Sequence, residues 1–164
     1  MRLKKLTTRN IQQIIDLEAR SAPDKPYYAK YDLEALNFLF DNPDKCGAIG
    51  IFDDKQLIGW GAYRTNWKKH TKERGSCEVS SIVVDISQRR KGLGSKILDG
   101  VLEEIKKNNS VKNVFLTVSP LNISALSLYI RYGFIIYDFR KDVYGPGADR
   151  VYLNKILKEK TIKL

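Results

Sequence analysis

The sequence is poor in cysteine and histidine and has no long hydrophobic run, and each scarcity excludes a class of protein. Two cysteines, Cys46 and Cys77, are too few for a disulfide framework, so we expect free thiols in a reducing cytoplasm. A single histidine, His70, excludes His-rich zinc sites, and we expect no metal. No stretch approaches the roughly 20 apolar residues of a membrane span, and no apolar run follows the basic start. We therefore expect no membrane segment and no signal peptide.

Positive charge, by contrast, is abundant. Lys and Arg number 29 against 19 Asp and Glu, which gives a formal net charge of +10. That excess favours an anionic partner, which can be a phosphorylated cofactor, nucleic acid or an acidic surface. A chain of 164 residues can bury roughly 70% of its unfolded surface. Because no repeat, low-complexity tract or linker divides it, we expect one domain over residues 1–164.

Local patterns predict an α+β fold. Apolar residues at helical spacing predict four helices, which begin after Thr7 or Thr8, after Asp32, at Leu93 and after Asn122. Apolar runs between turn residues predict strands at residues 2–6, 47–52, 57–64, 78–84, 114–118, 134–139 and 151–157. The order is two helices, an antiparallel run, and then strand–helix–strand–helix–strand.

A basic turn with two glycines joins the strand 78–84 to the helix that starts at Leu93. Free N–H groups and the positive dipole end make a helix start an anion site. Glycines at 92 and 94 let a phosphate approach the backbone, and residues 89–91 (Arg-Arg-Lys) add charge. The dinucleotide pattern G-x-G-x-x-G fails because Ile97 stands at its third glycine, and no P-loop Gly-Lys-Ser or Gly-Lys-Thr exists. The alternative is a solvated basic loop.

Two motifs in the right order carry a resemblance to a known family. Residues 89–94 fit R/Q-x-x-G-x-G/A, and residues 122–134 fit N-x-x-A-x-x-L-Y-x-x-x-G-F. Residues 144–155 resemble the same family's closing hairpin more loosely. The chain thus resembles, over residues 78–155, the GNAT superfamily of acetyl-CoA-dependent N-acetyltransferases. The resemblance implies a mixed, mostly antiparallel central sheet, flanked by helices, in which the parallel strands 78–84 and 113–118 splay apart.

The resemblance also implies an acetyl-CoA site. Backbone groups of Ile82 and Val84 would pair with the pantetheine amides as an added strand does. The amides of residues 90–95 would hold the pyrophosphate, and Asn122 would bind the cofactor arm. The expected cofactor-binding residues are Ile82, Val83, Val84, Arg89, Arg90, Lys91, Gly92, Leu93, Gly94, Ser95 and Asn122.

Acetyl transfer to an amine raises two proton problems, and the resemblance suggests a residue for each. The amine must lose a proton, and the leaving thiolate gains from receiving one. Tyr129 matches the family tyrosine that protonates the thiolate; the alternative is an aromatic that fills the core. Glu78 stands where some protein-lysine acetyltransferases place their base; the alternatives are an exposed strand-end carboxylate or a water relay.

The acceptor is the least specified part of the sequence. Tyr27 and Tyr28, in the loop where the family shapes its acceptor pocket, and Tyr144 are candidate substrate-binding residues. Thr117 replaces a glutamate often found in N-terminal acetyltransferases of ribosomal-protein type, and residues 148–150 read Ala-Asp-Arg instead of Glu-Asp-Ala. Both departures weaken the expectation of a peptide α-amine.

The leading hypothesis is transfer of acetyl from acetyl-CoA to a primary amine by direct attack in a ternary complex. The amine belongs to a small molecule, a protein lysine or a peptide N-terminus. The alternatives are a basic nucleic-acid-binding domain and a degenerate, coenzyme A-binding sensor. Against nucleic acid, the basic residues are scattered and no recognition motif appears, although residues 67–74 form a basic tract. A homodimer is left open, since this superfamily often dimerises.

Overall fold

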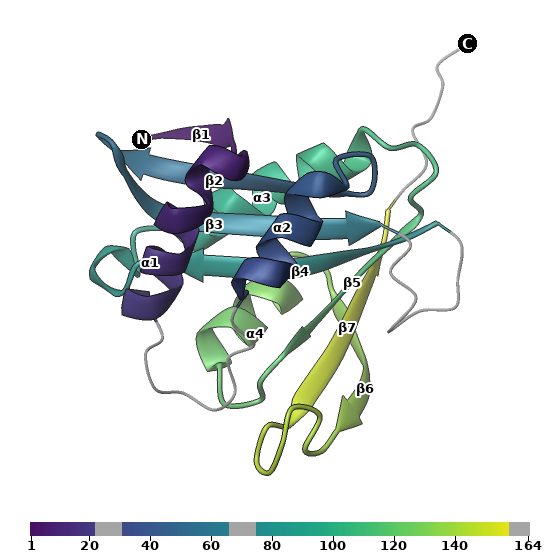
Figure 1. The fold of residues 1–164 in the computed structure, drawn as a ribbon. Helices are drawn as coiled ribbons and strands as arrows, with labels where there is room; N and C mark the ends of the chain where they lie inside the picture. The colour runs from purple at the N-terminus through teal and green to yellow at the C-terminus, as the bar shows by residue number, and fades with distance from the viewer. Residues whose placement is uncertain (22–30, 66–74, 158–164) are drawn as a thin grey trace.

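A seven-stranded sheet lies between two layers of helices in the computed structural model, which describes residues 1–21, 31–65 and 75–157 (Figure 1). The strands follow the order β1-β2-β3-β4-β5-β7-β6, and every neighbouring pair is antiparallel except β4 and β5. Their bounds are β1 Arg2–Lys5, β2 Cys46–Asp53, β3 Gln56–Thr65, β4 Ser76–Val84, β5 Asn113–Val118, β6 Ile135–Arg140 and β7 Arg150–Ile156. The predicted mixed, mostly antiparallel fold is confirmed.

The helices divide between the two faces of the sheet. They are η1 Thr8–Asn10, α1 Ile11–Ser21, α2 Leu33–Asp41, η2 Ile86–Gln88, α3 Leu93–Lys106 and α4 Ile123–Arg131. Helices α1 and α2 cover one face, while α3 and α4 lie behind the other (Figure 1). As the sequence predicts, Asp32 caps α2, because its carboxylate accepts the Ala35 N–H at 2.8 Å.

Each face of the sheet has its own apolar core. Under α1 and α2, Trp60 is fully buried among the leucines of both helices. On the opposite face, α3 lies directly on β3, because a Cβ atom at Gly61 would come within 2.6 Å of the Ile97 side chain. The two cores hold the central strands between them, and the functional groups described below lie along β4, in the turn that follows it and on α4.

The sequence predictions hold for most elements, with small shifts at their ends. The hairpin between β2 and β3 turns at residues 53–55, where Asp54 has a positive φ of 51°. Cys46 and Cys77 are free and buried, as expected. Strand β4 starts at Ser76 rather than at Glu78, because Ser76 and Cys77 already pair with β5. No helix in the described ranges is both long and apolar enough to cross a membrane.

Candidate active site

The sheet opens between its two parallel strands. Strands β4 and β5 pair at three positions, where Ser76, Cys77 and Glu78 lie opposite residues 113–115. Beyond this point β4 continues to Val84 beside β3, while β5 follows β7 in another direction (Figure 1). The two strands therefore splay apart, as predicted, and the edge of β4 that faces β5 has no paired strand beyond Glu78 among the described residues; this unpaired edge is called the groove edge below.

The groove edge of β4 presents backbone groups. Asp85 donates its N–H to the Ile58 carbonyl on β3 at 2.9 Å. Since successive backbone groups point to opposite edges of a strand, those of Val84 and Ile82 lie on the groove edge, where an extended ligand can pair with them. Val83 faces the other way, with its carbonyl beside Gly59 and its side chain buried. It supports the strand from the β3 side.

The glycine turn leads from the end of β4 into α3. Arg90 and Gly92 both have positive φ values, of 63° and 75°, and Gly92 is the N-cap of α3 without any side-chain cap. A Cβ atom at Gly92 would meet nothing within 4 Å. The first N–H groups of α3 belong to Leu93, Gly94 and Ser95, and they have no acceptor within the helix. Backbone of this shape offers N–H groups to an anion.

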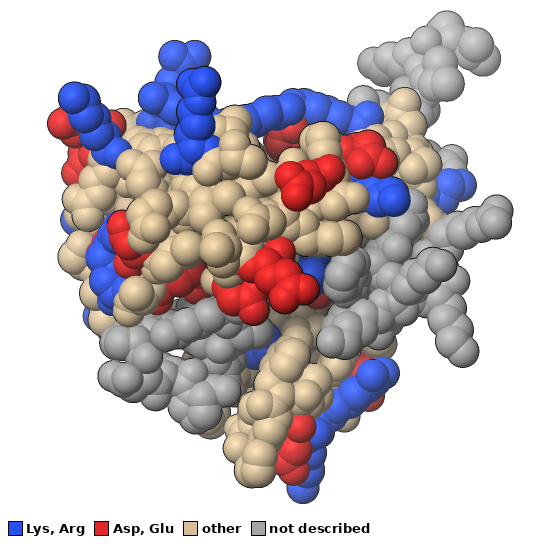
Figure 2. Space-filling view, viewed as in Figure 1, with Lys and Arg blue, Asp and Glu red and all other residues tan. Residues whose placement is uncertain are grey.

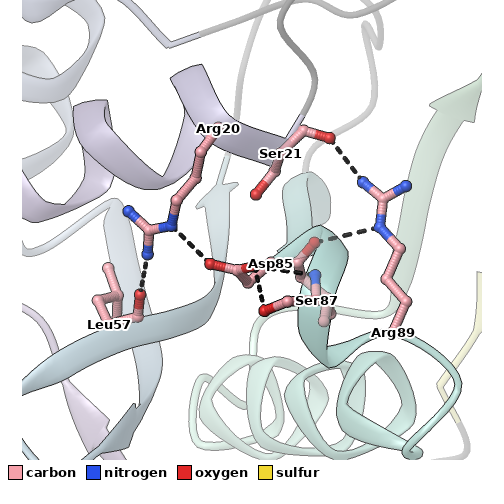
Figure 3. A network of polar contacts seen from close by, with 7 residues as sticks. Arg20, Ser21, Leu57, Asp85, Ser87 and Arg89 are labelled. Atoms are coloured by element: carbon pink, nitrogen blue, oxygen red, sulfur yellow. Dashed lines mark hydrogen bonds and ion pairs between the residues drawn. The ribbon is translucent and has the colours of Figure 1, made fainter.

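The three basic side chains of the turn do not act alike. Arg89 turns back from the helix start and donates to two backbone carbonyls, Ser21 O at 2.8 Å and Val84 O at 3.3 Å (Figure 3). Lys91 is exposed and donates to Gln88 at 2.9 Å. Arg90 is exposed as well, and so is Arg89, which differs from the other two in its contacts with backbone carbonyls. The positive charge expected at the anion site thus comes most directly from residues 90 and 91.

A buried carboxylate braces the start of the turn, and sequence reasoning missed it. Asp85 is 5% exposed; one oxygen accepts from Arg20 at 2.5 Å, and the other accepts from the Ser87 N–H and hydroxyl (Figure 3). Burial acts to raise the pKa of Asp85, but the hydrogen bonds from Arg20 and Ser87 outweigh it and hold that pKa below its usual value. The Asp-x-Ser spacing of Asp85 and Ser87 is typical of a turn in which the aspartate accepts from the backbone two residues on, and it could have indicated this contact.

Tyr129 and Asn122 both lie on α4, next to β5. Tyr129 is 7% exposed, and its ring packs edge-on against Phe134 with centroids 6.0 Å apart. The ring thus fills the core, which was the alternative interpretation, while the hydroxyl's role stays a prediction. Asn122 caps α4, since its side-chain oxygen accepts the Ala125 N–H at 3.2 Å.

Glu78 is neither exposed nor at a strand end. Glu78 as a whole is 6% exposed, and its carboxylate accepts from Arg64 on β3 at 2.8 Å. Beside this ion pair, Tyr31 donates to the Ser80 hydroxyl at 2.5 Å. Burial raises the pKa of Tyr31 to about 12, although the Arg64 charge acts against it. Glu78 therefore sits in a polar cluster at the point where β4 and β5 separate. Arg64 and Ser80 carry no motif, so the sequence could not assign them.

The candidate acceptor-binding residues are only partly placed. Tyr144 is 47% exposed, and the Arg150 guanidinium lies over its ring, 5.1 Å from the centroid. Burial lowers the pKa of Arg150. Tyr27, Tyr28, His70 and the basic tract 67–74 lie outside the described residues.

A sheet that opens beside an uncapped, glycine-bearing helix start is the architecture of a coenzyme A-dependent acyltransferase. Residues 11–134 match the family model described as acetyltransferase (GNAT) family, and the chain belongs to this family. In the described ranges no group of three or more His, Cys, Asp or Glu is arranged to hold a metal ion.

Individual relatives and structures agree with this assignment. The chain is 27% identical over 112 residues to streptothricin acetyltransferase A of Bacillus subtilis, covering 68% of this chain and 61% of that relative. It is 26% identical over 147 residues to an N-alpha-acetyltransferase of Saccharolobus solfataricus, covering 85% and 83%. The fold matches that of PaiA N-acetyltransferase from Thermoplasma acidophilum, solved in complex with coenzyme A, with TM-score 0.72, 19% identity and coverage of 95% and 98%.

Family membership confirms the predicted GNAT superfamily, whose members transfer acetyl groups from acetyl-CoA, and the solved structures agree with its fold. The chain spans 61% and 35% of the length of two curated relatives that it matches, so the activity of the whole protein is addressed as a proposal. The named acceptors of the relatives differ from one another, and the streptothricin relative extends well beyond the matched region. The acceptor of this chain is therefore addressed as a proposal.

Proposed function

We propose that the protein transfers the acetyl group of acetyl-CoA to a primary amine by direct attack in a ternary complex. The observation that carries this proposal is that the edge of β4 left unpaired by β5 leads directly to the uncapped start of α3. One binds an extended, amide-bearing chain, and the other binds an anion, and acetyl-CoA supplies both together with a reactive thioester.

The contacts proposed for the cofactor follow from the groove edge and the turn. Ile82 and Val84 pair with the pantetheine arm through backbone groups, and the amides of residues 90–95 hold the pyrophosphate. Asn122 uses its oxygen in the α4 cap, and its amide group has two N–H donors for a carbonyl of the arm. Arg90 and Lys91 supply charge, which speeds association more than it fixes geometry.

Glu78 is our proposed acceptor of the amine proton. A lysine-like amine with pKa near 10.4 is neutral in about one molecule in 2,500 at pH 7, which corresponds to about 4.6 kcal/mol. A carboxylate at the point where β4 and β5 separate lowers this barrier. The Arg64 contact engages Glu78 Oε2, and an ionised carboxylate has further lone pairs for an ammonium group or a bridging water.

Tyr129 is our proposed donor to the leaving thiolate. Its ring is fixed by the core, which suits a group that must meet one sulfur atom in one position.

The acceptor amine belongs to a small molecule, a protein lysine or a peptide N-terminus, and one experiment decides among them. Thiol release from acetyl-CoA is measured with spermidine, an acetylatable lysine peptide blocked at its N-terminus, and the unblocked tetrapeptide Met-Ala-Ser-Gly. We expect turnover with at least one amine above a control without amine. Binding of acetyl-CoA without turnover on this panel would instead identify a coenzyme A-binding sensor.

The face of the molecule in Figure 2 does not favour nucleic acid as a partner on that side. Acidic side chains gather over α2 on this face, while basic ones gather near β1 at its upper edge. The described residues of this face therefore form no continuous cationic surface of the kind that tracks a phosphate backbone.

We further infer a cytoplasmic, single-domain protein that forms a homodimer. The free, buried thiols support a reducing compartment, and a continuous sheet from β1 to β6 supports one domain. Strand β6 supports the dimer, because it is an edge strand with four half-exposed or exposed large apolar side chains: Ile135, Ile136, Tyr137 and Phe139.

A further inference from the structure

The C-terminal end of α1 is fastened to both ends of the turn that follows β4. Arg20 contacts Asp85 at 2.5 Å and also donates to the Leu57 carbonyl at 2.6 Å. The next residue, Ser21, accepts from Arg89 at 2.8 Å (Figure 3). Two adjacent residues of one helix are thus held by residues that lie 65 and 68 positions away in the chain.

Arg89 makes the second of these attachments by capping the helix. Ser21 is the last residue of α1, and its carbonyl is one of those that an α-helix leaves without an internal partner. A cation is favourable at this end of a helix, and Ser21 itself is 3% exposed. The rigid fork of a guanidinium lets one side chain reach two carbonyls, and here the second is Val84 O, on the groove edge of β4.

The last turns of α1 also connect to the acceptor side of β4. Glu18 accepts from the Trp60 indole N–H at 3.0 Å. The Trp60 ring meets Tyr31 edge-on at 5.2 Å, and Tyr31 donates to Ser80, two residues from Glu78. The same short helix end thus contacts the cofactor end of β4 through Arg89 and its acceptor side through Trp60.

We propose that Arg89 is a positioning residue that clamps α1 onto the groove edge of β4 and thereby couples cofactor binding to acceptor binding. The coupling rests on the proposed function, because it requires the pantetheine arm to lie along β4. A carbonyl has two lone pairs, so Val84 O can accept from the arm and from Arg89 together. When the pantetheine arm is bound along β4, it holds Arg89 in place. Arg89 in turn holds the end of α1, and this helix end supports the acceptor side of β4 through its contact with Trp60. By linkage the effect is mutual.

The test compares Arg89→Lys, which keeps the charge but loses the fork, with Lys91→Ala, which loses a neighbouring charge and leaves the clamp intact. Three quantities are measured in each variant and in the wild type: Kd for coenzyme A by calorimetry, hydrogen exchange of α1 with and without coenzyme A, and KM for whichever amine of the panel is turned over.

In Arg89→Lys we expect faster exchange in the last turn of α1, no slowing of that exchange by coenzyme A, and an acceptor KM raised at least about fivefold. Its Kd for coenzyme A should change by a smaller factor than the acceptor KM does. In Lys91→Ala the Kd should rise while acceptor KM and α1 exchange keep their wild-type values.

If Arg89→Lys keeps the wild-type hydrogen exchange of α1 and the wild-type KM for the acceptor, the proposal is overturned. The proposal is also overturned if Arg89→Lys changes only the Kd for coenzyme A, because Arg89 would then act as a phosphate ligand. The exchange measurements need no turnover, so an inactive amine panel counts against the proposed acceptor and leaves this test standing. If the wild type itself fails to bind coenzyme A, the proposed function fails, and this is seen separately in the calorimetry.

Discussion

Gly92 is the residue at which conformation and electrostatics can be separated. Its φ of 75° favours glycine, but Asn and Asp tolerate this region better than other residues, and the space around its Cβ position is open. We expect Gly92→Asp to weaken coenzyme A binding by about 2 kcal/mol or more, because a carboxylate stands at the anion site. Gly92→Asn, which has nearly the same shape without the charge, should lose much less. If calorimetry shows that the two variants lose equal binding free energy for coenzyme A, the pyrophosphate does not bind at this turn.

Tyr129 and Glu78 should respond differently to pH. Tyr129→Phe keeps the packed ring and removes the hydroxyl, so turnover should fall by roughly 10²- to 10⁴-fold at every pH. Glu78→Gln removes the proton acceptor, so its defect should shrink as pH rises and free amine becomes abundant. The measurement is a pH–rate profile of both variants with one amine from the panel.

Tyr63→Phe is the matched control, since Tyr63 lies on β3 and packs over Gly47, away from the groove edge. It should keep wild-type turnover. Normal turnover in Tyr129→Phe would leave that residue a purely structural role, and equal, pH-independent losses would deny Glu78 its role as base.

Asp85 makes the stability of the fold depend on pH in the acidic range. Its folded pKa lies below the ordinary value of 3.8, since hydrogen bonds from Arg20 and Ser87 outweigh its burial. The contact therefore stabilises the fold above that ordinary value and is lost as pH falls through the lowered folded pKa. We expect Asp85→Asn to lower Tm at neutral pH and the gap to wild type to narrow below about pH 4. A gap that is constant with pH, measured by thermal melts, contradicts this assignment.

At the scale of the element, α2 offers a comparison within one helix. Asp32 caps its N-terminus, so Asp32→Ala should lower the free energy of unfolding by about 1 kcal/mol. Asp41 is exposed and ends the same helix, where a negative charge opposes the dipole. Asp41→Ala should leave stability unchanged or slightly raised. Urea unfolding measures the free energy of unfolding of both variants. If both lose the same amount, the loss comes from removing a negative charge and not from losing the cap.

Whole elements were predictable because their signals are local. The apolar spacing that starts at Leu93 and the polar turn at residues 53–55 each report on their own segment. The contacts of the site are not local: Arg64 meets Glu78 across two strands, and Arg89 meets Ser21 across 68 positions. A motif indicated where Arg89 stands but not where its side chain points. Glu78, expected at a strand end, is buried because an arginine with no motif of its own neutralises it.

At the scale of the molecule, β6 should determine the oligomeric state. Ile135 on this edge strand is 69% exposed, so a second copy can bury it by pairing edge to edge. We expect the wild type to be a dimer by light scattering and Ile135→Lys to be a monomer with unchanged Tm. Ile123→Lys, at a 64% exposed position on α4, is the control and should remain a dimer. A wild type that stays monomeric at high concentration disproves this interface.

The short ladder between β4 and β5 also bears on how long the protein survives in a cell. Three paired positions join the part of the sheet built from β1–β4 to the part built from β5–β7. In the proposed function, acetyl-CoA lies along the rest of that seam. A ligand present at a hundredfold its Kd stabilises the native state by about 2.7 kcal/mol. Molecules that open along the seam, and so meet proteases, become rarer as acetyl-CoA accumulates.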